Sequence, residues 1–160
     1  MNTGISVSAS DIAKYFIWKA KSEGKTITNK KLQKLLYYSQ AWSMVYGKKP
    51  LFKEDIEAWI HGPAIRVVYE QYKKFGFSSI TEDIKESDVK GLPSFDLLES
   101  IWTTYGKYDA QYLEELTHNE EPWQIARQNL EVSESSNNVI SLDDMQNYYE
   151  KVLKEVSGKA

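Results

Sequence analysis

Two histidines and a pair of neighbouring glutamates are the residues of this 160-residue chain best suited to chemistry. His61 stands directly before a Gly-Pro pair, and His118 is followed closely by Glu120 and Glu121. Imidazoles and carboxylates bind zinc, or exchange protons as general acid and base, when a fold brings them together. Their spacing does not fit the His-Glu-x-x-His motif, and a zinc site takes three or four fixed ligands. We therefore expect no metal and no cofactor, with His118 near a helix C-terminus and both glutamates at the start of the next helix.

Motifs that would mark an enzyme are missing from the sequence. It contains no Gly-x-Ser-x-Gly elbow, no P-loop and no dinucleotide-binding glycine pattern. It also contains no cysteine, which excludes disulfides, thiolate metal sites and cysteine nucleophiles. We do not expect an enzyme, although a histidine–carboxylate pair assembled by the fold stays open as an alternative.

The segment Trp59-Ile60-His61-Gly62-Pro63 combines an aromatic residue with a tight corner. One interpretation is structural: Trp59 fills the core, and the Gly-Pro pair sets the turn. The other is functional: the corner presents Trp59, His61 and Tyr69 as a recognition surface, since Tyr and Trp are common at binding hot spots.

Two tyrosine pairs, Tyr37-Tyr38 and Tyr148-Tyr149, raise a similar question. In a helix one ring of each pair points inward and its neighbour points about 100° away. The outward ring of each pair is a candidate contact residue for a partner.

Positive and negative charges are unevenly distributed along the chain. Residues 1–53 contain ten lysines and two acids, a net charge of +8, whereas residues 54–160 contain ten basic residues and twenty-one acids, a net charge of −11. The basic third predicts either an anionic partner (nucleic acid or an acidic protein surface) or a fold in which the two parts neutralise each other. Arginine, which phosphate and base readers use heavily, occurs only at positions 66 and 127, so nucleic acid is the less favoured partner.

Length and composition indicate one globular domain over residues 1–160 with frayed ends. Hydrophobic residues make up 41% and aromatic residues 13% of the chain, and the net charge is −3, a composition that excludes intrinsic disorder. No apolar run reaches the ~18 residues of a membrane span, and residues 1–10 lack the basic and apolar parts of a signal peptide. We expect a soluble, cytoplasmic protein that does not contact a membrane.

Capping and stop signals predict a mainly α, compact multi-helix domain with a small β element. Ser8 followed by Asp11 is typical of a capping box, Thr28 of a second helix start, and Pro63 of the first position of a helix. We expect helices at 8–23, 29–46, 64–75, 95–105, 109–118, 122–128 and 142–155 and a short strand at 56–60. Residues 77–93 are expected to form a loop, with a second short strand near 79–80 left open. The residues expected to be mostly buried are Leu32, Leu35, Leu36, Trp42, Trp59, Val68, Trp102, Leu113 and Trp123.

Three blocks of sequence, in a fixed order, carry a family resemblance. The first is Thr28-Asn29-Lys30-Lys31-Leu32-Gln33-Lys34-Leu35-Leu36-Tyr37-Tyr38-Ser39-Gln40. The second combines Pro50-Leu51-Phe52, Ile56-Glu57-Ala58-Trp59 and Gly62-Pro63 before Val68-Tyr69, and the third is Thr117-His118 followed by Pro122-Trp123-Gln124-Ile125-Ala126-Arg127. Together they resemble the phage-associated, SocA-like antitoxin family with a Panacea domain, over about residues 8–153. Ala64 departs from the valine usual in that family. The signature residues, expected to be largely structural, are Leu32, Leu35, Tyr37, Trp59, Gly62, Pro63, Tyr69, His118, Pro122 and Trp123.

The resemblance implies an antitoxin of a bacterial or prophage toxin–antitoxin system, whose partner is a protein toxin encoded by a neighbouring gene. Some members of that family deliver their toxin to a protease. We expect the toxin to dock through Lys31, Lys34, Tyr38, His61 and Arg66, because the first three are spaced three and four apart and share one side of a helix. The alternative is a nucleic-acid-binding regulator or a small phage-associated enzyme that uses the basic N-terminal third.

Overall fold

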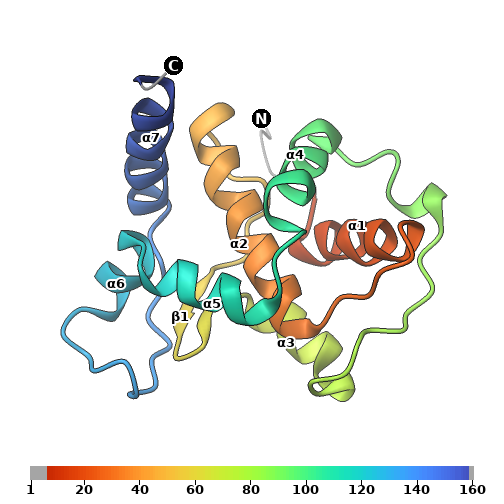
Figure 1. Ribbon diagram of the computed structural model, residues 1–160, viewed down its shortest axis with the longest axis horizontal. Coiled ribbons are helices and arrows are strands. Elements are labelled where there is room, and N and C mark those ends of the chain that lie inside the picture. The colour runs from red at the N-terminus through yellow and green to blue at the C-terminus, as the bar shows by residue number, and fades with distance from the viewer. Residues whose placement is uncertain (1–6, 159–160) are drawn as a thin grey trace.

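Helix α2 (Asn29–Tyr46) runs through the middle of the molecule in the computed structural model, which describes residues 7–158 (Figure 1). Other helices pack against it on several sides, so buried residues occur all around α2 rather than along a single stripe. The helices in contact with it are α1 (Ala9–Ser22), α3 (Arg66–Tyr72), α4 (Phe95–Tyr105), α5 (Ala110–His118) and α7 (Leu142–Gly158).

The remaining elements are short. Strands β1 (Glu57–Trp59) and β2 (Gly62–Ala64) form an antiparallel hairpin in which Trp59 pairs with Gly62. The segment around Val139 lies along the other edge of β1, because Ala58 N donates to Asn138 O at 2.8 Å and Ile140 N donates to Ile56 O at 2.7 Å. Helix α6 (Glu121–Arg127) and two 3₁₀ turns, Lys73–Phe75 and Glu86–Asp88, complete the described chain. The prediction of a mainly α domain with a small β element is confirmed.

Helix starts follow the predicted caps. Ser8 Oγ accepts a hydrogen bond from Asp11 N at 3.1 Å while Asp11 Oδ2 accepts one from Ser8 N at 3.0 Å, which is the capping box. Thr28 caps α2 by accepting from Lys31 N at 3.2 Å. These bonds satisfy backbone N–H groups that a helix leaves free at its first turn.

The predicted start of the third helix is wrong, and the second short strand is not formed. Pro63 lies in β2 and not at the start of a helix, and α3 begins at Arg66. Proline has no N–H to donate and fits an edge strand of a small sheet, while Gly62, with a φ of +108°, turns the chain sharply enough for the hairpin to close. The second strand left open near 79–80 is a single bridge between Thr28 and Ser79.

Hydrophobic side chains from most helices form one core cluster. Of the nine residues expected to be mostly buried, seven are. Trp42 and Trp59 are half-buried, because each indole N–H reaches a polar partner toward the surface. Trp42 Nε1 donates to Tyr105 Oη at 2.9 Å, and Trp59 Nε1 donates to Glu57 Oε1 at 2.8 Å. No helix within residues 7–158 has the length and apolar character that crossing a membrane requires.

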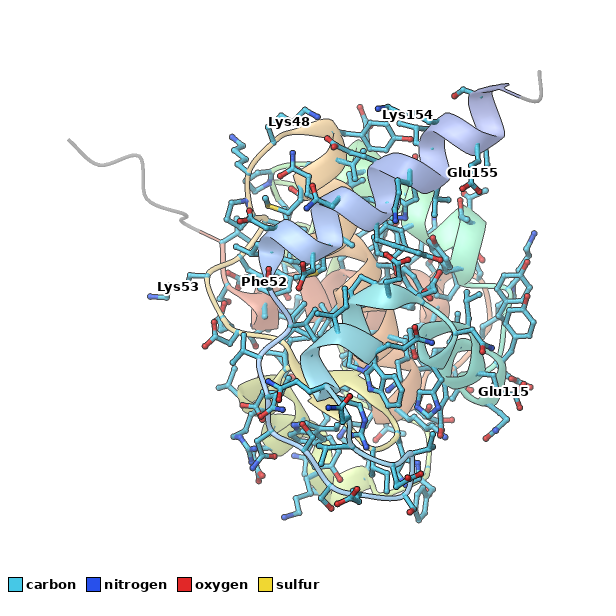
Figure 2. The ribbon with its side chains drawn as sticks, turned by 90° about the vertical axis from the view of Figure 1, so that its left-hand side faces the viewer. Lys48, Phe52, Lys53, Glu115, Lys154 and Glu155 are labelled. Carbon is cyan, nitrogen blue, oxygen red and sulfur yellow. The ribbon has the colours of Figure 1, made fainter. Side chains whose placement is uncertain are left out.

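Ion pairs join the basic N-terminal third to the acidic remainder. Lys19 pairs with Glu99 and Lys21 with Asp83, each at 3.0 Å. Lys48, labelled in Figure 2, donates to Glu150 at 2.6 Å and so links the end of α2 to α7. These pairs support the interpretation in which the two parts of the chain neutralise each other across the fold.

Candidate functional site

A cleft of about 370 Å³ lies where the β1–β2 hairpin meets the N-terminal half of α2. We call it the hairpin cleft. Three aromatic side chains line it, Trp59, Tyr69 and Phe77. Three ionisable side chains line it as well: the exposed His61 at the rim, Lys30, and the buried Lys34 at the floor. A volume of this size is in the range that binds a small ligand or a few side chains of a partner.

The aromatic wall is held in place from both sides. The Trp59 and Tyr69 rings meet edge to face, with centroids 5.0 Å apart. Arg66 covers the Trp59 ring, its guanidinium carbon 5.1 Å from the ring centroid, while it donates to Glu57 at 2.7 Å. Phe77 is 98% exposed at the rim of the cleft. Phe77 thus adds an exposed apolar side chain to a cleft that Trp59 and Tyr69 line, and Trp and Tyr are the residue types most common at binding hot spots.

Lys34 provides a buried cation on the cleft floor. Lys34 is 2% exposed, and its Nζ donates a long hydrogen bond of 3.4 Å to Pro63 O. Burial, together with the charge of Lys30, lowers the pKa of Lys34 from 10.5 to about 7, although Glu114 opposes this change. Within residues 7–158, no carboxylate lies close enough to form an ion pair with Lys34.

Glu114 of α5 lies beside this cation but is engaged by other groups. Lys30 Nζ contacts Glu114 Oε1, and His61 Nδ1 lies 3.2 Å from Glu114 Oε2. Burial alone would raise the pKa of Glu114, yet the hydrogen bonds from Lys30 and His61 hold it below its ordinary value. Glu114 is therefore an anion that already forms an ion pair with Lys30 and contacts His61.

His118 belongs to the packing behind the cleft. Its ring stacks on Trp123 with centroids 4.0 Å apart, and its Nε2 lies 4.0 Å from Glu114 Oε2. Burial lowers the pKa of His118 despite the nearby carboxylate, so the neutral imidazole is favoured. In the part of the chain that the structure describes, no three histidine, aspartate or glutamate side chains are grouped as metal ligands would be.

The structure separates the five residues predicted to form the docking face. His61 and Arg66 are exposed at the hairpin, as a docking face requires. Lys31 is half-buried and donates to Gly106 O at 2.6 Å, where it caps the C-terminal end of α4. Lys34 and Tyr38 are buried. The expectation that Lys31, Lys34 and Tyr38 share an exposed side of the helix is wrong, because neighbouring elements cover α2 on that side as well.

Tyr38 instead belongs to a buried polar cluster around Glu120. Tyr38 Oη and Tyr149 Oη both donate to Glu120 Oε1, at 2.7 and 2.8 Å. Tyr37 Oη lies 3.0 Å from Tyr149 Oη, so both tyrosines of the first pair are internal. Burial raises the pKa of Glu120 to about 7, while the tyrosine hydrogen bonds oppose the rise. The interpretation of Tyr38 as an outward-pointing contact is wrong.

The signature residues connect the blocks to one another. Leu32 and Leu35 are fully buried in the core. Trp123 of the third block donates from Nε1 to Trp59 O of the second block at 2.8 Å, and this bond fixes the hairpin against α6. Two cleft residues, Lys30 and Phe77, were not singled out from the sequence. A lone phenylalanine between Gly76 and Ser78, in a polar segment, was the available signal for the second.

Comparison with known proteins gives a family. Residues 32–124 match the model of the family described as "Antitoxin SocA-like, Panacea domain". The chain is also 31% identical to "Antitoxin SocA" of Caulobacter vibrioides (strain NA1000 / CB15N) over 132 residues, which cover 75% of this chain and 70% of that protein. No solved structure matches the chain. The matched range contains α2 from Leu32 onward, the hairpin, Phe77 and most of α6. The chain therefore belongs to the family of SocA-like antitoxins with a Panacea domain.

Proposed function

We propose that this protein is a non-enzymatic antitoxin that neutralises a protein toxin, encoded by a neighbouring gene, by binding it directly at the hairpin cleft. The observation that carries the proposal is the exposed aromatic rim of the cleft, with Phe77 almost completely open to solvent beside Trp59 and Tyr69. This rim lies in the part of the chain that matches the antitoxin family.

The geometry of the cleft suits protein binding. Trp59 is held by the hydrogen bond that the Trp123 indole donates to its backbone oxygen, and by its contacts with Tyr69 and Arg66. Side chains that are already ordered lose little conformational entropy when a partner covers them. The exposed His61 would, when protonated, steer an acidic surface toward the rim, an effect that appears mainly in the association rate.

The charge pairing of the N-terminal third argues against the nucleic-acid alternative. Nucleic-acid binders present free lysines and arginines to phosphates. Here Lys19, Lys21, Lys30 and Lys48 pair with acids from later in the chain, and Lys31 caps a helix. A protein partner is thus the better match to the surface.

Co-expression tests this proposal. The product of the adjacent gene should stop growth when produced alone, and this chain should restore growth and co-elute with that product as a complex. Measuring the half-life of the toxin with and without the antitoxin distinguishes sequestration from delivery to a protease. A neighbouring gene that is harmless, or a toxin that is neutralised without any complex forming, contradicts direct binding.

A further inference from the structure

Lys34 has more hydrogen-bonding capacity than the described residues use. An ammonium carries three N–H donors, and in residues 7–158 the only recorded acceptor is Pro63 O at 3.4 Å. Glu114, the carboxylate whose charge acts on Lys34, is already in contact with Lys30 through Oε1 and with His61 through Oε2. Burying a charged or polar group without full hydrogen bonding is costly, so a buried lysine in this position calls for an explanation.

The Lys34 side chain is also fixed in direction. A Cβ atom built at Gly62 would lie 2.4 Å from Lys34 Cε and 3.2 Å from Nζ, so the absence of a side chain at Gly62 leaves the space that the lysine occupies. Thr117 Oγ1 borders the same space. Lys34 therefore lines the hairpin cleft from the space that Gly62 leaves free.

We propose that the hairpin cleft receives an acidic side chain of the toxin together with a neighbouring apolar side chain. The carboxylate pairs with Lys34 on the floor, and the apolar side chain packs on Trp59, Tyr69 and Phe77. This inference rests on the proposed function, because it names the chemistry of the partner at the same site.

Charge complementarity selects an acidic group over the other choices. The charged and titratable groups that face Lys34 are Lys30 from α2, Glu114 and His118 from α5, and His61 from the hairpin. Glu114 forms its ion pair with Lys30, which leaves Lys34 without a paired carboxylate among the described residues. A cationic side chain would be repelled by Lys30 and by protonated Lys34, whereas a carboxylate gains an ion pair with a lysine that is only 2% exposed.

Binding of a carboxylate is coupled to the protonation of Lys34. In the free protein burial lowers the pKa of Lys34 to about 7, so the ammonium and the neutral amine are both populated near neutral pH. A carboxylate in contact with Nζ favours the ammonium, so binding takes up a proton and weakens as the pH rises above 7. A Lys34→Met variant separates this effect from any titration of His61 or His118.

Short peptides test the inference without the toxin. The probes are acetyl-Phe-Asp-Leu-amide and acetyl-Phe-Asn-Leu-amide, which differ only in the charge of one side chain, and binding is followed by the NMR shifts of the Trp59 indole and the Lys34 side chain. We expect the Asp peptide to bind the wild-type chain at least tenfold more tightly than the Asn peptide. Lys34→Met should abolish that preference, and Lys53→Met, a change at an exposed lysine, should keep it.

Several outcomes overturn the inference. Equal affinity for the two peptides, no binding of the Asp peptide at millimolar concentration, or an Asp preference that survives in Lys34→Met each contradict it. Should Lys34→Met fail to fold, the titration of Lys34 in the wild-type chain decides: its pKa must rise when the Asp peptide is bound, and an unchanged pKa contradicts the ion pair.

The same variants separate this inference from the proposed function. A toxin that binds wild type and Lys34→Met equally well leaves direct neutralisation standing and removes the role of Lys34. Peptide discrimination in a chain whose neighbouring gene product is harmless leaves the acidic-ligand site standing and removes the antitoxin proposal.

Discussion

Lys34 Cε lies where a side chain at Gly62 would begin: a Cβ atom built on Gly62 would be only 2.4 Å from it. The lysine comes from the central helix and the glycine from the hairpin, so each explains the other. The hairpin approaches α2 closely because Gly62 has no side chain, and Lys34 can be buried because that space is free. Two residues 28 positions apart in the printed sequence thus form one feature of the cleft.

Replacing Gly62 with alanine should destabilise the protein. Gly62 has a φ of +108°, a backbone conformation that residues with a side chain rarely adopt, and the added methyl group would displace Lys34. We expect a loss of about 1–3 kcal/mol in the free energy of unfolding, measured by urea titration. Gly91→Ala, where nothing lies within 4 Å of the added Cβ, is the control and should stay near the wild-type value. Equal losses in the two variants would contradict this explanation of Gly62.

Replacing Lys34 with methionine should change how stability depends on pH. In the unfolded chain Lys34 keeps its ordinary pKa of 10.5, whereas burial lowers it to about 7 in the folded protein. Between these values the unfolded state binds the extra proton, so the Lys34 contribution to stability rises as the pH rises. Between pH 7 and 9 we expect the free energy of unfolding of the wild type, measured by urea titration, to rise by on the order of 2 kcal/mol relative to that of Lys34→Met. Parallel pH profiles for the two proteins would show that burial does not lower the pKa of Lys34.

Glu120 should make the stability of the protein depend on pH in the opposite direction, and at lower pH. Burial raises the pKa of Glu120 from 4.5 to about 7, so the folded state holds the proton over that range and stability falls as the pH rises through it. Between pH 5 and 7 we expect the free energy of unfolding of the wild type, measured by urea titration, to fall by on the order of 2 kcal/mol relative to that of Glu120→Gln. Glu121→Gln, a change at the exposed neighbour, should follow the wild-type profile, and a Glu120→Gln profile that does the same would rule out a raised pKa.

Tyr38 should matter for folding and not for binding. Tyr38→Phe removes the 2.7 Å hydrogen bond to Glu120 without changing the ring that stacks on Tyr105. Hydrogen bonds to charged groups contribute about 1.5–3 kcal/mol, so we expect a loss in that range and an unchanged affinity for the toxin. Tyr112→Phe, at a partly exposed tyrosine, serves as the control for stability. A Tyr38→Phe variant of normal stability that no longer binds the toxin would return Tyr38 to the docking face.

Helix positions could be predicted from local signals, and the burial of α2 could not. The Ser8–Asp11 capping box and the Thr28 cap are contacts between residues three apart, so the sequence alone reveals them. Lysines at positions 31 and 34 ordinarily indicate a solvated helix face. Lys31 instead donates to the carbonyl oxygen of Gly106, which lies 75 residues further along the chain. No pattern near Lys31 in the sequence predicts this contact.

The candidate site was predictable at its corner and not on its floor. The aromatic and Gly-Pro segment singled out Trp59, His61 and Tyr69, and all three line the cleft. Glu114, which contacts Lys30 and His61, lies in α5, and no motif in the sequence of that helix predicts a functional carboxylate. Assembling that floor requires the packing of α5 against α2, which is a property of the whole fold.

The affinity of the chain for its toxin after a change at the cleft rim tests the central claim most directly. The variant Phe77→Ser combined with His61→Ala alters two exposed side chains, and the loss of the His61–Glu114 contact should lower the melting temperature only slightly. Val156→Ser, at an exposed apolar residue of α7, is the matched control. If the toxin docks at the hairpin cleft, the Kd of the double variant for the neighbouring gene product rises at least tenfold while that of Val156→Ser stays at the wild-type value. An unchanged Kd for the folded double variant would contradict docking at this cleft.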